Sequence, residues 1–209
     1  MTFSIVARCS KTLALGVAVS TAVPAVGSVV PHVKVNVGAI ATQAQTNIAY
    51  GIEGLRLIEN GETPEKVFKK LLEEDKDREK RQVTIIDAKG RTAAFTGNET
   101  ENWKGHVIGE DCVVAGNMLT GRDVIEAMRD SFDEKKGTLA LRLLKSLEAG
   151  QNAGGDKRGR LSAALLVADS RWIGSGRPLL DLRVDAHSNP VAELLRVYTV
   201  SRGYFHVPE

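Results

Sequence analysis

The sequence predicts an α+β fold in which two β-sheets lie between layers of helices. Runs that are typical of strands come first along the chain, helical patterns follow in pairs, and strands then return before a last helix. Strands and helices do not alternate one by one, which argues against a doubly wound parallel sheet. The 209 residues fit one domain, and the sequence shows neither an internal repeat nor a linker.

The N-terminal stretch has two incompatible interpretations. Residues 12–30 form an uncharged run after two basic residues, as in a secretory leader. However, residues 2–7 are already largely apolar before the first positive charge, and glycine and proline interrupt the later run. We therefore favour two strands, residues 3–7 and 13–19, joined by a polar hairpin connection. This interpretation favours a cytoplasmic protein, and secretion stays open if the run acts as a leader.

Alternating and β-branched residues predict the other strands. Residues 33–42 alternate at their start and are expected to form a third strand. A later pair of runs is separated by a short turn that contains Gly90, which is typical of a hairpin. The strands predicted after residue 42 are 82–87, 92–96, a pair of short strands within 106–119, 162–168 and 180–184.

Apolar residues at helical spacing predict the helices. Residues 47–60 carry four of them and stop at Gly61. Thr63 and Pro64 suit the start of the next helix, because threonine is a good N-cap and proline fits the first turn. The remaining predicted helices are two within 123–149, broken near Gly137, and one at 191–201.

The composition limits the classes of function. The chain is 43% hydrophobic and 26% charged with a net charge of +2, which is typical of a globular protein. Lysine and arginine are spread along the chain, so we expect neither nucleic acid nor a membrane as a partner. Cys9 and Cys112 could form one disulfide. The four histidines are isolated from one another, and we expect no metal and no cofactor.

Residues 150–160, GQNAGGDKRGR, form a glycine-rich loop. The loop lacks the Gly-Lys-Ser/Thr ending of a P-loop and the spacing of a dinucleotide fingerprint. Its basic residues and Asp156 could still bind an anionic group. From composition alone, a solvated surface turn is the favoured interpretation.

Thr2 is the candidate nucleophile. If Met1 is removed, as expected when a small residue follows it, Thr2 carries both a hydroxyl and the α-amine of the chain. An unperturbed α-amine, with a pKa of about 7.7–8, can take the hydroxyl proton directly or through water. A threonine in second position is also common without any such role, so position alone decides little.

Four segments carry a resemblance to a known family: TFSIVARCSKTLALGVAVST, AVGSVVPHVKVNVGAIATQAQTNIAYG, AGQNAGGDKRGRLSAALLV and RVDAHSNPVAEL. With them the chain resembles DUF1028, a bacterial and archaeal family of unknown function that is assigned to the N-terminal-nucleophile (Ntn) hydrolase superfamily. The resemblance spans nearly the whole chain. It implies a single Ntn-hydrolase-like domain over residues 1–209, an αββα four-layer sandwich, and Thr2 as the nucleophile.

The resemblance also implies a role for Lys34. The proteasome-like branch of the superfamily places a lysine on an early strand beside the nucleophile, and Lys34 is similar in position. Its ammonium would favour the neutral amine and stabilise developing negative charge. This sequence departs from that branch in one respect, because residues 16–21 contain no carboxylate to act as the acidic partner.

Five further residues are candidates for binding substrate. Gln43 and Asn117 lie at predicted strand ends, where they could donate a hydrogen bond to an oxyanion or to a substrate carbonyl. Asp156, Arg158 and Arg160 belong to the glycine-rich loop and could orient a polar substrate.

Two functions remain open from the sequence. The first is an Ntn-type amidohydrolase in which Thr2 attacks a small-molecule or peptide amide and water cleaves the acyl-enzyme. The second is a non-catalytic self-assembling or binding protein on the same scaffold, possibly exported, because the acidic partner is missing and a fold does not fix a function. A homo-oligomer is expected in either case.

Overall fold

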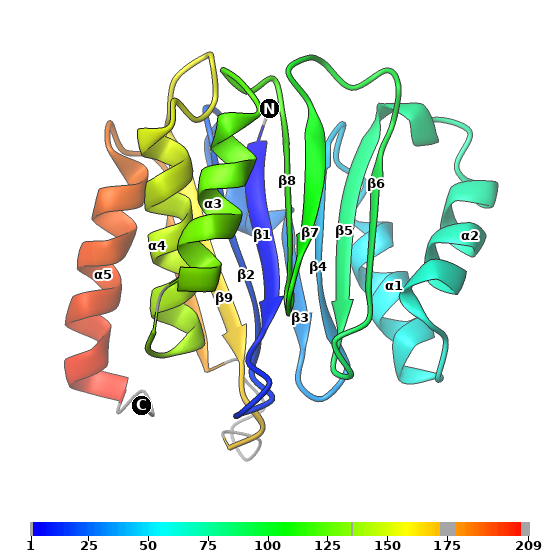
Figure 1. The fold of residues 1–209 in the computed structure, drawn as a ribbon, viewed down its shortest axis with the longest axis horizontal. Helices are drawn as coiled ribbons and strands as arrows, with labels where there is room; N and C mark the ends of the chain where they lie inside the picture. Colours follow the sequence, from blue (N-terminus) through cyan, green and yellow to red (C-terminus); the bar gives the residue numbers. More distant parts are fainter. Residues whose placement is uncertain (1, 135, 172–178, 206–209) are drawn as a thin grey trace.

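Two antiparallel sheets form the middle of the computed structural model, which describes residues 2–134, 136–171 and 179–205 (Figure 1). One sheet has six strands in the order β10-β9-β2-β1-β8-β7, and the other has four in the order β3-β4-β5-β6. The strands are β1 (Thr2–Arg8), β2 (Leu15–Thr21), β3 (Pro31–Lys34), β4 (Gly38–Ala44), β5 (Arg81–Asp87), β6 (Thr92–Thr96), β7 (Gly105–Gly109), β8 (Cys112–Asn117), β9 (Ser162–Ala168) and β10 (Leu180–Val184).

Helices cover the outer face of each sheet. Figure 1 shows α3, α4 and α5 on one side of the strands and α1 and α2 on the other. The helices are α3 (Asp123–Glu134), α4 (Leu139–Asn152) and α5 (Pro190–Phe205) on the six-stranded sheet, and α1 (Ala49–Glu59) and α2 (Pro64–Glu74) on the four-stranded sheet. This αββα order of layers confirms the expected fold class. Within the described residues, no helix combines the length and apolar character needed to cross a membrane.

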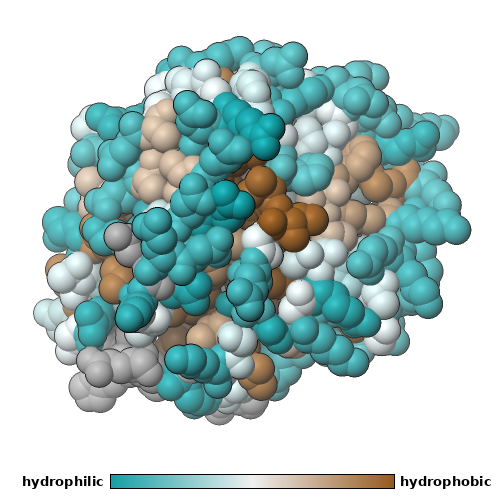
Figure 2. Space-filling model, in the orientation of Figure 1, coloured by the Kyte–Doolittle hydropathy of each residue, from teal (hydrophilic) through white to brown (hydrophobic). Residues whose placement is uncertain are grey.

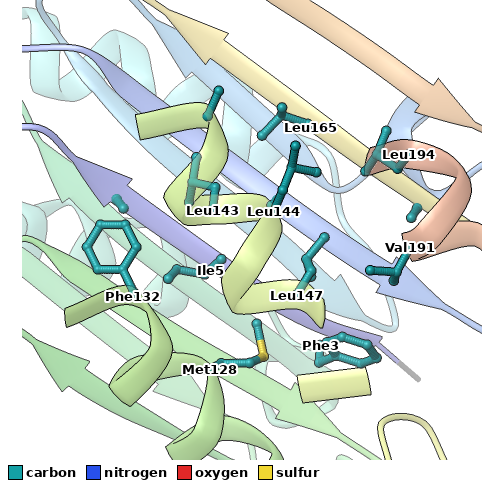
Figure 3. Close-up of a cluster of buried hydrophobic side chains, with 14 of the residues drawn as sticks. Phe3, Ile5, Met128, Phe132, Leu143, Leu144, Leu147, Leu165, Val191 and Leu194 are labelled. Atoms are coloured by element: carbon teal, nitrogen blue, oxygen red, sulfur yellow. The ribbon is translucent and has the colours of Figure 1, made fainter. Parts of the chain in front are cut away.

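Side chains alternate across β1 and so divide between two cores. Phe3 packs with Met128 in the core between the six-stranded sheet and its helices (Figure 3). Val6 belongs to the core between the two sheets. Because successive side chains of a strand point to opposite faces, Thr2 and Ser4 face the layer between the sheets as Val6 does.

The N-terminal stretch forms a hairpin at the centre of the six-stranded sheet. Strands β1 and β2 pair in antiparallel register, with Arg8 opposite Leu15. The Cys9 amide donates to the carbonyl of Ala14 at 2.9 Å and closes the turn. The predicted hairpin is confirmed.

The predicted single strand over residues 33–42 is wrong. The segment forms two strands, β3 and β4, joined by a turn in which the Val37 amide donates to the Lys34 carbonyl at 3.1 Å. Asn36 has a φ of 60° in this turn. Asparagine tolerates this left-handed conformation better than most residues, which explains why the chain reverses here although its flanks are β-branched.

Asp75, the residue that follows α2, joins this helix to α1 and to β5. Its carboxylate accepts hydrogen bonds from Arg81 Nε at 2.8 Å and from the Tyr50 hydroxyl at 3.1 Å. Arg81 also donates to the carbonyl of Gln45, just after β4, at 2.9 Å. The hydrogen bond from Arg81 lowers the pKa of Asp75 to about 2. Burial and the neighbouring carboxylate raise the pKa of Tyr50.

We expect acid to weaken the fold through Asp75. A carboxyl whose folded pKa is depressed stabilises the folded state above its unfolded pKa, and this contribution is lost as the pH falls, here from about 4 to about 2. Asp75→Asn should remove this part of the pH dependence and lower the free energy of unfolding at pH 7 by about 1–3 kcal/mol. Urea unfolding measured from pH 7 to pH 2 tests this. Asp130→Asn, which changes an exposed ion pair, is the control. Equal acid sensitivity of the wild type and Asp75→Asn would contradict the assignment.

Candidate active site

The layer between the two sheets is apolar at one end and polar at the other. Its apolar part consists of side chains such as Val6, Val17, Val19, Ala39, Ile86 and Val113. Toward the start of β1 the inward side chains become polar, and each is at most 5% exposed: Thr2, Ser4, Thr21, Gln43, Gln82, Thr84 and Asn117. Buried polar groups are costly unless they are hydrogen-bonded, so this end of the layer requires a network of partners.

Thr2 lies at the polar end, between β2 and β8. Its hydroxyl is 3.4 Å from the hydroxyl of Thr21, and its backbone pairs with Asn117 across the β1–β8 ladder. Gln43 Nε2 reaches the Thr2 carbonyl at 3.5 Å from the other sheet. Contacts from both sheets therefore surround the candidate nucleophile.

The amide of Gln82 organises this polar end. Its Nε2 donates to the carbonyls of Gly105 at 3.1 Å and Gly116 at 2.8 Å. A carbonyl oxygen can only accept, so these two bonds fix which end of the amide is nitrogen. Gln82 Oε1 must then accept, and it does so from Gln43 Nε2 at 2.8 Å and Asn117 Nδ2 at 2.9 Å.

This orientation differs from the donor roles expected for Gln43 and Asn117. Both side chains direct their amide nitrogen to Gln82 inside the protein. Gln43 Oε1 is buried and has no hydrogen-bond partner in the part of the chain that the structure describes. One N–H of each amide is therefore committed to Gln82 and is not available to an oxyanion beside Thr2.

Asp156 joins the glycine-rich loop to the end of β2. It is 4% exposed, and its Oδ2 accepts from the amide of Ala22, the residue after Thr21, at 3.1 Å. Its Oδ1 accepts from the Arg158 amide at 2.9 Å, and the Arg158 guanidinium lies 3.3 Å from Oδ2. The glycine-rich loop therefore belongs to the candidate site. Through Asp156 it places a carboxylate at the end of β2, where residues 16–21 contain none. Both predicted basic residues are exposed, but Arg158 contacts Asp156, whereas Arg160 donates to the Ser188 carbonyl at 3.1 Å.

The structure does not bring Lys34 to Thr2. Lys34 pairs with Gly38 at the turn end of β4, whereas Gln43, which contacts Thr2, lies at the other end, about 16 Å along the strand. The Lys34 ammonium is 2.6 Å from Glu59 of α1, and both side chains are 47% exposed. The structure therefore does not support the catalytic role that the family resemblance implies for Lys34, because Lys34 and Thr2 lie at opposite ends of β4.

A pocket of about 380 Å³ opens beside the polar end. Asn117 belongs both to its wall and to the hydrogen-bond network of Gln82. The polar and charged residues of the lining include Gln45, Lys80, Glu99, Glu101, Asn117 and Arg158. Asn117, which pairs with Thr2 across the β1–β8 ladder, therefore connects the pocket wall to the candidate nucleophile.

The described cysteines and acidic residues form neither a disulfide nor a metal-binding group. Cys9 and Cys112 are free thiols and form no disulfide. Burial raises the pKa of the Cys112 thiol to about 12. Among the residues that the structure describes, histidine, cysteine, aspartate and glutamate side chains form no group of three or more that could hold a metal ion.

We expect Gln82→Leu to destabilise the protein strongly. The change leaves the amide nitrogen of Asn117 and the carbonyl of Gly116 without their partner, and each such buried group costs about 1–3 kcal/mol. The free energy of unfolding should fall by about 3 kcal/mol or more, measured by urea denaturation. Gln45→Leu, at an exposed glutamine, should change it by only about 0.5 kcal/mol. A similar loss for both variants would contradict the central role of Gln82.

Comparisons with known proteins identify the family. The model of the family of unknown function DUF1028 matches residues 2–194. The crystal structure of protein SPO2555 from Silicibacter pomeroyi, from the same family, is 34% identical, with a TM-score of 0.89 over 96% of this chain and 89% of that chain. Anbu (ancestral beta-subunit) from Yersinia bercovieri is 9% identical, with a TM-score of 0.41 over 99% of this chain and 98% of that chain, a similarity too low to support a conclusion. None of the curated proteins matches the sequence. The chain belongs to the DUF1028 family.

Proposed function

We propose that the protein is an Ntn-type amidohydrolase that uses Thr2 as its nucleophile once Met1 is removed. The main support is the environment of Thr2, which is 5% exposed and has its hydroxyl 3.4 Å from that of Thr21. A threonine without a function at this position would not explain why buried polar side chains surround it between the two sheets. The substrate would be a small-molecule or peptide amide that enters through the pocket beside Asn117.

The reaction would use the two functional groups of one residue. The free α-amine of Thr2 takes the proton of Oγ1, which attacks the amide carbonyl and forms a tetrahedral intermediate. The same proton passes to the leaving amine as the C–N bond breaks, and an ester to Thr2 remains. Water, deprotonated by the α-amine, then cleaves the ester and restores the hydroxyl. Thr21 and Asp156 would hold the end of β2 and so position the nucleophile.

Thr2→Ala should abolish amide cleavage, with a loss of about 10⁴-fold or more, because no other step replaces an absent nucleophile. Intact mass measures whether Met1 is removed, and a panel of peptide and acylated amides measures activity. Thr2→Ser should retain part of the activity, and Thr199→Ala, at an exposed helix position, should retain all of it. Activity should rise with pH through about 8 as the α-amine loses its proton. A mature chain that keeps Met1 would contradict the mechanism.

Self-assembly without catalysis is the second candidate, and the edge of the six-stranded sheet favours it. Strand β7 ends that sheet, and its Ile108 is 53% exposed. Figure 2 shows a largely hydrophilic face with a hydrophobic group near its middle, where Figure 1 places β7. An exposed sheet edge with an apolar side chain is suited to pairing with another chain.

Ile108→Lys should reduce the oligomer size, measured by light scattering after gel filtration, if copies pair along β7. Ile52→Lys is the matched control, because Ile52 is 56% exposed on α1. Equal oligomer sizes for wild type and both variants would exclude assembly through this edge.

A further inference from the structure

We propose that the pocket lined by Glu99, Glu101 and Asn117 binds a cationic N–H group of its ligand, a primary ammonium or a guanidinium. The inference deepens the proposed function. It rests on that function only where the ligand is identified with the substrate. It is carried by the orientation of the Asn117 amide and by the balance of charge in the pocket wall.

Asn117 supplies a fixed hydrogen-bond acceptor. The side chain is 2% exposed overall, and its Nδ2 donates to Gln82 Oε1 at 2.9 Å. The orientation of Gln82 is set by two backbone carbonyls, so the Asn117 amide cannot turn over without breaking this bond. Asn117 Oδ1 accepts no hydrogen bond from the described residues. It is also not one of the fully buried side-chain atoms without a partner, so it is accessible from outside. A ligand group that meets this oxygen must therefore carry an N–H or O–H.

The two cations of the pocket wall already have carboxylate partners. Lys80 Nζ is 2.7 Å from Asp77, and the Arg158 guanidinium is 3.3 Å from Asp156. Arg158 also holds Asp156 through its backbone amide. Neither aspartate belongs to the pocket lining, so the charges of Lys80 and Arg158 are offset from outside the pocket.

The two glutamates of the wall form no such close ion pair, although Glu99 interacts with Lys80 at longer range. Glu99 and Glu101 are exposed, and within the described residues neither carboxylate lies within 4.0 Å of a basic side chain. The pocket wall therefore contains two carboxylates outside close ion pairs and Asn117, whose side-chain oxygen accepts no hydrogen bond from the described residues. Charge-assisted hydrogen bonds to such acceptors are formed by ammonium and guanidinium groups. An anionic ligand would face both glutamates and would compete with Asp156 for Arg158.

Three probes of similar length test the proposal: Nα-acetyl-lysinamide, Nα-acetyl-norleucinamide and the α-amide of Nα-acetyl-glutamate. They carry a cation, no charge and an anion, respectively. Binding is measured by NMR titration of the full-length Thr2→Ala protein, which cannot cleave a probe. We expect the lysine probe to bind about tenfold more tightly than the norleucine probe and its affinity to fall with added salt.

Glu99→Gln and Glu101→Gln should each weaken the lysine probe about threefold and leave the norleucine probe unchanged. Both residues are exposed, so the variants are expected to fold. Glu110→Gln, at an exposed glutamate in the β7–β8 turn, is the matched control and should change nothing. Equal or tighter binding of the other two probes, no binding of any probe, or an unchanged affinity in both glutamate variants would overturn the proposal.

The outcome is separate from that of the hydrolase. Selective binding by Thr2→Ala together with no amide cleavage by the wild type would leave the cation site in place and remove the enzyme. Cleavage of amides by the wild type without preference for a cationic group would support the enzyme and exclude the cation site.

Discussion

The arrangement around Thr2 depends on the full set of hydrogen bonds made by one buried amide, that of Gln82. Between two packed sheets there is no bulk water to replace a missing partner, so each polar group must find one within the protein. The two N–H groups of Gln82 share three acceptors, on Thr96, Gly105 and Gly116, and its Oε1 accepts from Gln43 and Asn117. It thereby links β5 to β4, β6, β7 and β8, and holds the two sheets together where β1 begins.

The same amide limits the chemistry of the site. Gln43 and Asn117 each direct an N–H to Gln82, so in the proposed reaction that N–H is not available to an oxyanion at Thr2. What Asn117 offers to the pocket is an acceptor. From residue type alone, Asn117 would be assigned as a donor. Its orientation is instead set through Gln82 by the backbone carbonyls of Gly105 and Gly116.

Much of the fold could be predicted from local patterns. The β1–β2 hairpin follows from two apolar runs with a polar connection, and Thr63 accepts from the Lys66 amide at 3.4 Å as an N-cap should. Gly61 ends α1 with a φ of 93°. The prediction of a single strand over residues 33–42 was wrong, because the β-branched residues on both sides of Asn36 are typical of a continuous strand. The role of Lys34 failed with it.

The polar network was missed, although the sequence contained a signal for it. In the predicted strand 82–87, Gln82 and Thr84 share the inward face with Ile86, and a polar residue on the inward face of an apolar strand requires a partner. What the sequence could not supply is the identity of that partner, because Asn117 lies 35 residues away on another sheet.

By itself, the sequence determined the order of the elements, the caps and most of the turns, because these depend on hydrogen bonds and periodicity over a few neighbouring residues. The packing of the sheets decided which polar groups meet: Thr2 with Thr21 and Gln43, and Gln82 with Asn117. It also separated Lys34 from Thr2. The physical reason is that strand register and sheet stacking are set by the burial of whole faces, which no short stretch of sequence encodes.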